Sequence, residues 1–211
     1  MTFLLFLDYI GTAVFAISGV LTASEKRLDL FGAIFIGVVT AIGGGTTRDL
    51  LLGVQPVTWL QSSSYIWVIL VSLIIAVLFR RYLAKIRRTL FLFDTIGISV
   101  FTVIGVEKAL SLNLSPVVAV LMGMTTAVVG GVIRDTLNNE VPLIFRREIY
   151  ATACIGGAVV YILMRWAGMD ASLNQIFTVV AIFSIRLLSI RYNWSMPILS
   201  MPKRDDDTTI V

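Results

Sequence analysis

Histidine is absent from this sequence of 211 residues, and cysteine occurs once, as Cys154. Such a chain cannot form an internal disulfide, and it lacks the imidazole and thiolate groups from which most zinc and transition-metal sites are built. Cys154 lies in an apolar run, which is typical of a small buried residue. We therefore expect no bound metal cofactor and no other resident cofactor.

Charged residues are also scarce. They make up 14% of the chain, whereas 57% of the residues are hydrophobic, and the mean hydropathy is +0.92. A soluble domain needs a charged outer surface, which this chain has too few charges to provide. A lipid bilayer removes that need, and helices satisfy their backbone hydrogen bonds internally, as lipid demands. Composition therefore predicts an all-α membrane protein whose main partner is the lipid bilayer.

Seven apolar segments follow one another along the chain, at residues 3–23, 30–53, 63–83, 91–109, 116–138, 149–167 and 172–190. A spanning helix needs about 20 residues, and the fourth, sixth and seventh segments have shorter uncharged cores. We nevertheless expect seven transmembrane helices, joined by short loops into one bundle. The first segment contains Asp8 and lacks a positive start, so it is expected to remain as a helix rather than to be cleaved as a signal peptide.

The basic residues stand mainly in loops that follow the odd-numbered segments. These residues are Lys26, Arg27, Arg80, Arg81, Lys85, Arg87, Arg88, Arg146, Arg147, Arg191, Lys203 and Arg204. With seven spans, all of these loops lie on one side of the membrane. We expect the protein in the inner (plasma) membrane of the cell. The positive-inside rule then places the N-terminus outside and the C-terminus in the cytoplasm. The net charge of +4 is thus explained by topology, and we expect no nucleic-acid partner.

The first half of the chain repeats in the second half at a fixed offset of 86 residues, without a gap. The residues that match in this way include Asp8, Gly11, Val14, Phe15, Gly19, Val20, Ala23, Gly37, Thr40, Ala41, Gly44, Gly45, Arg48, Asp49 and Pro56. Self-similarity at a fixed offset indicates a repeated structural unit. Because each unit has three spans, the second copy must enter the membrane from the opposite side.

The sequence therefore predicts two inverted three-helix repeats plus a seventh helix. We expect the first repeat at residues 1–90, the second at 91–168, the seventh helix at 169–191 and a polar cytoplasmic tail at 192–211. Inverted repeats are frequent in transport proteins, with the permeant site near the membrane midplane. A gene duplication kept only for packing is the alternative.

Glycine and threonine concentrate in the second and fifth segments. Residues 40–49 read Thr-Ala-Ile-Gly-Gly-Gly-Thr-Thr-Arg-Asp, and residues 126–135 read Thr-Ala-Val-Val-Gly-Gly-Val-Ile-Arg-Asp. Each glycine weakens a helix by about 1 kcal/mol relative to alanine, so these runs predict a kink or an unwound turn whose freed carbonyls could meet a cation. The alternative is that small residues four apart only let helices pack closely. A nucleotide-binding loop is excluded, because its Lys-Ser/Thr ending is missing.

The candidate pore and ion-binding residues come from these two runs. They are Thr40, Gly43, Gly44, Gly45, Thr46, Thr47, Arg48, Asp49, Thr126, Gly130, Gly131, Arg134 and Asp135. Charged residues inside spans are costly and usually mark a pathway or an ion pair. Asp8 should lie at the depth of Arg48, and Asp94 at the depth of Arg134, so we predict these two ion pairs, either structural or with a role in conduction. The aspartates that follow the arginines should point about 100° away around the helix. There they could cap a broken segment or attract cations.

Both motif copies, together with residues 8–19 and 94–97, resemble the prokaryotic trimeric intracellular cation (TRIC) channels, a bacterial group also described as a glycine-transporter domain. The resemblance covers about residues 3–190. It implies a homotrimer of seven-helix protomers, each with its own pore, and potassium-selective, sodium-permeable conduction past the glycines of the second and fifth segments. Some members of the family are tied instead to glycine uptake.

The expected function is therefore a passive, potassium-preferring channel for monovalent cations. A secondary transporter for glycine or another small amino acid is the alternative, and a scaffold without a permeant is a third. The motifs contain no pairing of a nucleophile with a base, so we do not expect an enzyme.

Overall fold

The structure, a computed structural model, describes residues 2–83 and 89–197 and consists of helices joined by short links. The helical elements are α1 (Thr2–Glu25), α2 (Leu30–Leu51), α3 (Thr58–Gln61), α4 (Ser63–Leu83), α5 (Thr89–Ser111), α6 (Pro116–Leu137), the 3-10 turn η1 (Leu143–Phe145), α7 (Ala151–Trp166) and α8 (Ala171–Arg191). Part of the predicted basic loop after the third segment, and the predicted tail from residue 198 onward, lie outside the described residues.

Six of the helices are long and apolar enough to cross a membrane, and α7, with 16 residues, is shorter. The chain is therefore an all-helical membrane protein with six strongly apolar helices and a shorter seventh. The fourth and seventh predicted segments correspond to α5 and α8, which have 23 and 21 residues and are longer than their uncharged cores suggested. The short helices α3 and η1 were not predicted, because each has only one turn.

The same type of cap begins α2 and α6, and both helices have 22 residues. The Asp29 carboxylate accepts a hydrogen bond from the Gly32 backbone N–H at 2.7 Å. The Ser115 hydroxyl, 86 residues later, accepts one from the Val118 backbone N–H at 3.4 Å. Side chains of this kind satisfy backbone donors that a helix start leaves free. The capping chemistry thus recurs with the sequence offset.

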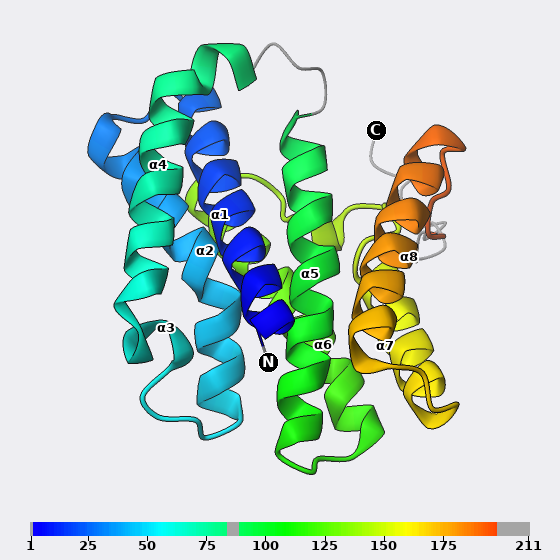
Figure 1. Cartoon of the computed structure of the whole chain (residues 1–211). Helices are drawn as coiled ribbons and strands as arrows, with labels where there is room; N and C mark the ends of the chain where they lie inside the picture. The colour runs from blue at the N-terminus through cyan, green and yellow to red at the C-terminus, as the bar shows by residue number, and fades with distance from the viewer. Residues whose placement is uncertain (1, 84–88, 198–211) are drawn as a thin grey trace, which may run out of the picture.

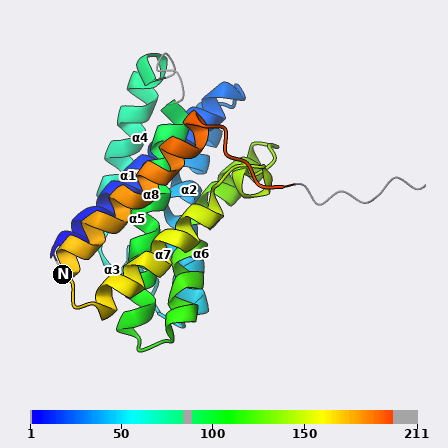
Figure 2. The same cartoon turned by 90° about the vertical axis from the view of Figure 1, so that its right-hand side faces the viewer.

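Helix α1 lies centrally, in contact with α2, α4 and α5, while α6 packs on both α2 and α5 (Figure 1). In this view α1 runs upward and α5 downward, and α2 and α6 also run in opposite directions. Helices α7 and α8 pair with each other and lie against α5 and α6 (Figure 2). Phe15 of α1 meets Phe101 of α5, its match at the 86-residue offset, with ring centroids 5.0 Å apart.

Candidate functional site

Helices α2 and α6 run as uninterrupted α-helices through the glycine runs at residues 43–45 and 130–131. The predicted unwound turn is therefore wrong, while the kink, the other form of break expected from these glycines, stays a prediction. The glycines weaken each helix locally, but they let the neighbouring backbone approach more closely than any side chain would allow. Close packing of small residues offsets the lost helix propensity.

The two helices cross where the glycine runs meet, and the contact is reciprocal. A Cβ added to Gly44 would lie 2.1 Å from the Thr126 carbonyl oxygen, and one added to Gly130 would lie 2.5 Å from the Thr40 carbonyl oxygen. The hydroxyls of Thr40 and Thr126 each donate to the carbonyl four residues earlier, at 2.6 Å. Gly43 belongs to the same contact, since its Cβ would lie 2.7 Å from a side-chain carbon of Ile133. The structure thus brings the predicted threonine and glycine stripes of both segments together.

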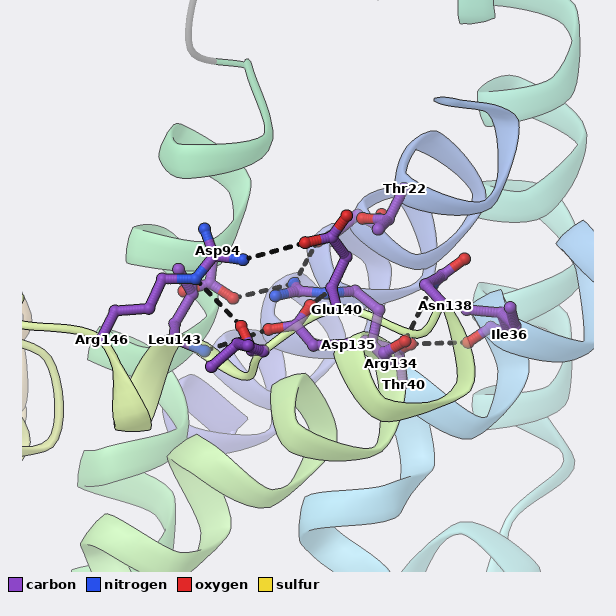
Figure 3. Close-up of polar contacts among 12 residues, drawn as sticks. Thr22, Ile36, Thr40, Asp94, Arg134, Asp135, Asn138, Glu140, Leu143 and Arg146 are labelled. Carbon is purple, nitrogen blue, oxygen red and sulfur yellow. Dashed lines mark hydrogen bonds and ion pairs between the residues drawn. The ribbon is translucent and has the colours of Figure 1, made fainter. Parts of the chain in front are cut away.

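Near the end of α6, the fully buried Arg134 holds three polar groups (Figure 3). Its Nη1 lies 2.9 Å from Asp94 Oδ1, which confirms the predicted pair, and the same nitrogen donates to Ser18 Oγ at 2.7 Å. Its Nε donates to Asp135 Oδ1 at 2.8 Å. The expectation that Asp135 points away is wrong, because the guanidinium folds back onto the next residue. Two carboxylates surround one buried cation, so this site has one negative charge in excess.

At the opposite end of the crossing, the predicted pair of Asp8 and Arg48 is not formed; both residues belong to the described part of the chain. Arg48 instead binds Asp49, with Nε and Nη2 each 2.8 Å from Oδ1. Asp8 accepts a hydrogen bond from the Tyr65 hydroxyl of α4 at 2.6 Å. Equal depth in the membrane did not decide the pairing, because Arg48 binds the adjacent Asp49 and Asp8 binds Tyr65. This end also holds two carboxylates for one guanidinium.

A cavity of about 20 Å³ lies at this first end. Its polar lining includes Asp8, Thr12, Arg48 and Thr58. Beside it, Gly45 leaves open space, since the nearest neighbour of an added Cβ would be Arg48 Nη2 at 3.8 Å. A space of roughly 10–15 Å³ with several polar partners holds one water molecule. The cavity therefore fits an occupant of the size of a water molecule or a bare monovalent cation.

The two aspartates of the Arg-Asp motifs also organise the chain that follows each long helix. Asp49 Oδ2 accepts the Thr58 backbone N–H at 2.7 Å, where α3 begins. Asp135 Oδ2 accepts the Leu143 backbone N–H at 3.2 Å, where η1 begins. The proposed capping role of these carboxylates is thus observed, although the segment each one caps is the next short helix rather than a break in its own helix.

The predicted candidates Thr46 and Thr47 make local hydrogen bonds. Thr46 Oγ1 accepts the indole N–H of Trp59 at 3.0 Å, and Thr47 Oγ1 donates to the Gly43 carbonyl at 2.9 Å. The first bond fastens α3 over the end of α2, and the second stays within α2. Neither hydroxyl is part of the lining of the cavity described above.

Three residues near the second end were missed from the sequence. Arg186 of α8 is fully buried and could have been noticed as a charge within an apolar segment. Ser18 carries no such signal, because its match at the 86-residue offset is isoleucine. Tyr150 was missed because it lies 85, not 86, residues after Tyr65, so a gap-free comparison pairs neither tyrosine with the other.

Two links between helices meet at Glu140, outside the spans. Lys26, which follows α1, forms an ion pair with Glu140, and Arg146 Nη2 lies 3.4 Å from Glu140 Oε2. The hydrogen bond from Lys26 holds the pKa of the Glu140 carboxyl below its ordinary value. This exposed cluster ties the α1–α2 link to the α6–α7 link.

Comparison with known proteins gives the family. A model described as glycine transporter matches residues 5–81 and 91–166. A UPF0126 membrane protein of Vibrio cholerae is 42% identical over 204 residues, covering 96% of this chain and 85% of that protein. The UPF0126 inner membrane protein YadS of Escherichia coli is 40% identical over 197 residues, covering 92% and 95% of the two chains.

A solved structure extends the likeness to three dimensions. The TRIC trimeric intracellular cation channel orthologue from Rhodobacter sphaeroides has a TM-score of 0.87 and 36% identity, covering 92% of this chain and 100% of that one. The chain therefore belongs to the family that the glycine transporter model describes, whose solved prokaryotic relatives are TRIC channels.

Proposed function

We propose that this chain is a passive, potassium-preferring channel for monovalent cations, with a pore in each protomer of a homotrimer. The observation that carries the proposal is the charge at the two ends of the α2–α6 crossing. Each end holds two carboxylates and one guanidinium in or beside the spans, which leaves one negative charge in excess at each. Buried negative charge attracts cations and repels anions. The likeness to solved TRIC channels supports the same function.

The proposed pore follows α2 and α6 through the crossing. It connects the cavity beside Asp8 to the Arg134 site and passes the carbonyls of Thr40 and Thr126. In the described state these carbonyls lie so close to Gly130 and Gly44 that no ion passes between α2 and α6. Conduction therefore requires the two helices to separate slightly at the glycines.

We also propose that residues 1–90 and 91–168 form two inverted units. The opposite directions of α1 and α5, the recurring caps of α2 and α6, and the contact between the matched rings of Phe15 and Phe101 support this arrangement. In the membrane, the exposed apolar side chains of α4, such as Trp67 and Leu78, would face lipid or a second copy. Three copies per complex would agree with the trimers named among the solved relatives.

A carrier for glycine is the second candidate, because Arg48 and Asp8 both line the cavity and could bind a carboxylate and an amine. The cavity of about 20 Å³, however, fits an occupant of water size, and a glycine zwitterion is larger than a water molecule. A carrier would have to widen this space substantially, whereas a small cation fits it as it is.

The two candidates are distinguished by measuring both activities on one preparation. We expect unitary currents in planar bilayers with potassium chloride, a reversal potential that favours potassium over sodium and chloride, and no glycine counterflow in liposomes. Glycine counterflow without unitary currents would establish the carrier instead. Native mass measurement in mild detergent should give three copies per complex, and a stable, active monomer would contradict the trimer.

A further inference from the structure

The two ends of the molecule contain the same residue types in different arrangements. At the first end, Tyr65 donates to Asp8 at 2.6 Å and the arginine lies apart from that carboxylate. At the second end, Arg134 donates to Asp94 at 2.9 Å, and the buried hydroxyl of Tyr150 has no hydrogen-bond partner among the described residues. One aspartate is therefore bound by a tyrosine and the other by an arginine.

Tyr150 stands in the second site where Tyr65 stands in the first. The two tyrosines are 85 residues apart, one fewer than the repeat offset. The link after α6 accounts for this difference of one residue. Asp135 binds the backbone N–H of Leu143, eight residues after itself, whereas Asp49 binds that of Thr58, nine residues after itself. Both tyrosines follow that bound N–H by seven residues.

The Tyr150 hydroxyl lies within the Arg134 site. From the point where a Cβ of Gly131 would lie, the distances are 3.1 Å to Tyr150 Oη, 3.5 Å to Asp94 Oδ1 and 3.6 Å to Arg134 Nη2. Asp94 Oδ2 and Arg134 Nη2, like the tyrosine hydroxyl, are buried and have no partner in the part of the chain that the structure describes. The Tyr150 hydroxyl and Arg134 Nη2 thus border the same small space beside the Asp94 carboxylate, whose other oxygen, Oδ2, has no partner among the described residues.

Arg186 fixes the position of the tyrosine ring from outside the two repeated units. Its guanidinium carbon lies 5.0 Å from the Tyr150 ring centroid and 4.8 Å from that of Phe91. Its Nη1 donates to the Ile149 carbonyl at 2.8 Å and to Glu148 at 3.2 Å. A guanidinium stacked on an aromatic face in this way is favourable, and more so when it is desolvated. The hydroxyl is therefore held at the site by contacts that do not involve the hydroxyl itself.

We infer that Tyr150 is the alternative hydrogen-bond donor for Asp94 and that the second site exchanges between two states. In the described state Arg134 binds Asp94 and Ser18. In the other state the Tyr150 hydroxyl binds Asp94 Oδ2, and Arg134 leaves Asp94 and Ser18 but keeps Asp135. The second end then has the arrangement seen at the first, including space for a water-sized occupant. The exchange changes hydrogen-bond partners only and transfers no proton.

This inference rests on the proposed channel function in one respect: the exchange would open the second end of the pore. Tyr150→Phe keeps the ring on which Arg186 stacks and removes only a hydroxyl without a partner, so the variant should fold like the wild type. We expect at least a tenfold lower open probability in planar bilayers, with the unitary conductance unchanged. Ser18→Ala removes one ligand of Arg134 and should raise the open probability, and adding Tyr150→Phe should abolish that rise.

Tyr65→Phe is the matched control, since it removes the equivalent hydroxyl at the end that is already open. An open probability of Tyr150→Phe equal to that of the wild type, or an equal reduction in Tyr65→Phe, would overturn the inference. Hydrogen exchange separates it from the proposed function. If the wild type carries no current, Ser18→Ala should still speed backbone exchange in residues 131–145 several-fold, and Tyr150→Phe should reverse this. Exchange that is not reversed would overturn the two-state site itself.

Discussion

At the scale of single residues, the α2–α6 crossing depends on the absence of one carbon atom at each of two positions. Alanine at position 44 would place Cβ 2.1 Å from a backbone oxygen, which cannot rotate away as a side chain can. Overpacking of this kind costs about 1–3 kcal/mol, more than the gain in helix propensity of about 1 kcal/mol. We expect Gly44→Ala to lower the unfolding temperature in detergent.

The adjacent glycine provides the control for this experiment. Gly45→Ala places Cβ 3.8 Å from the nearest atom, Arg48 Nη2, so the substitution should leave the unfolding temperature unchanged or raise it slightly. Equal loss of stability in Gly44→Ala and Gly45→Ala would show that the helix crossing is looser than described.

The two intramembrane aspartates should respond differently to the same substitution. Asp94→Asn weakens the charge pairing of a fully buried arginine, and removing one partner from a buried ion pair costs about 3–5 kcal/mol. We expect a loss near 3 kcal/mol, because Asp135 remains. In Asp8→Asn the amide oxygen still accepts the Tyr65 hydroxyl, so the loss should stay under about 1 kcal/mol. Chemical unfolding in detergent measures both, and equal losses would contradict the asymmetry.

These residues also mark what the sequence could and could not predict. The pair of Asp94 with Arg134 follows from depth along two antiparallel helices, and the structure confirms it. The same reasoning failed for Asp8, because depth says nothing about which neighbouring side chain is nearest around the helix. Tyr65, which takes the place of the arginine, comes from a third helix whose position was not predicted.

At the scale of elements, apolar length and capping residues were sufficient to place the long helices. The predicted segments 30–53 and 116–138 contain α2 and α6 and exceed them by no more than two residues, because an Asp or Ser cap precedes each helix and loop residues follow. Helix continuity through the glycines was not predictable, because it depends on a partner helix 86 residues away in sequence. Local propensity was overruled by packing.

The links between elements should give the protein a dependence on pH. The pKa of Glu140 is lower in the folded protein than its ordinary value of 4.5, so the Lys26–Glu140 contact stabilises the fold above that pH. The stabilisation is lost as pH falls below it and the carboxylate becomes protonated. We expect the unfolding temperature of the wild type to decrease below about pH 5, and that of Glu140→Gln to decrease less. A decrease of the same size in Glu140→Gln would exclude this link as a cause.

At the scale of the whole molecule, the basic loops set an orientation that can be tested directly. Loops after odd-numbered spans carry the positive charge, so reporter fusions after Arg88 and after Arg191 should both read cytoplasmic, and a tag at the N-terminus should read external. As a control, the basic residues of one of these loops are replaced and basic residues are introduced into a loop on the opposite side. Fusions that read on opposite sides would contradict the seven-span arrangement.

The repeat explains why so much of the architecture could be predicted from one sequence. An offset of 86 residues with matched glycines and charges requires two similar units, and an odd number of spans requires opposite orientations. The same offset could not predict where the units differ. Arg186 lies outside both units, and Ser18 is matched by an isoleucine in the other unit; these two residues make the second end unlike the first.

The reciprocal contact of Gly44 with Gly130 also bears on how the protein is made. Helix α2 leaves the ribosome well before α6, so its glycine face enters the bilayer before the helix that covers it exists. A nascent chain that has reached only α4 therefore presents a small-residue surface that another membrane helix could occupy. Completion of the core is a step after insertion, and a substitution at Gly130 would delay the covering of the α2 surface as well as weaken the contact in the finished protein.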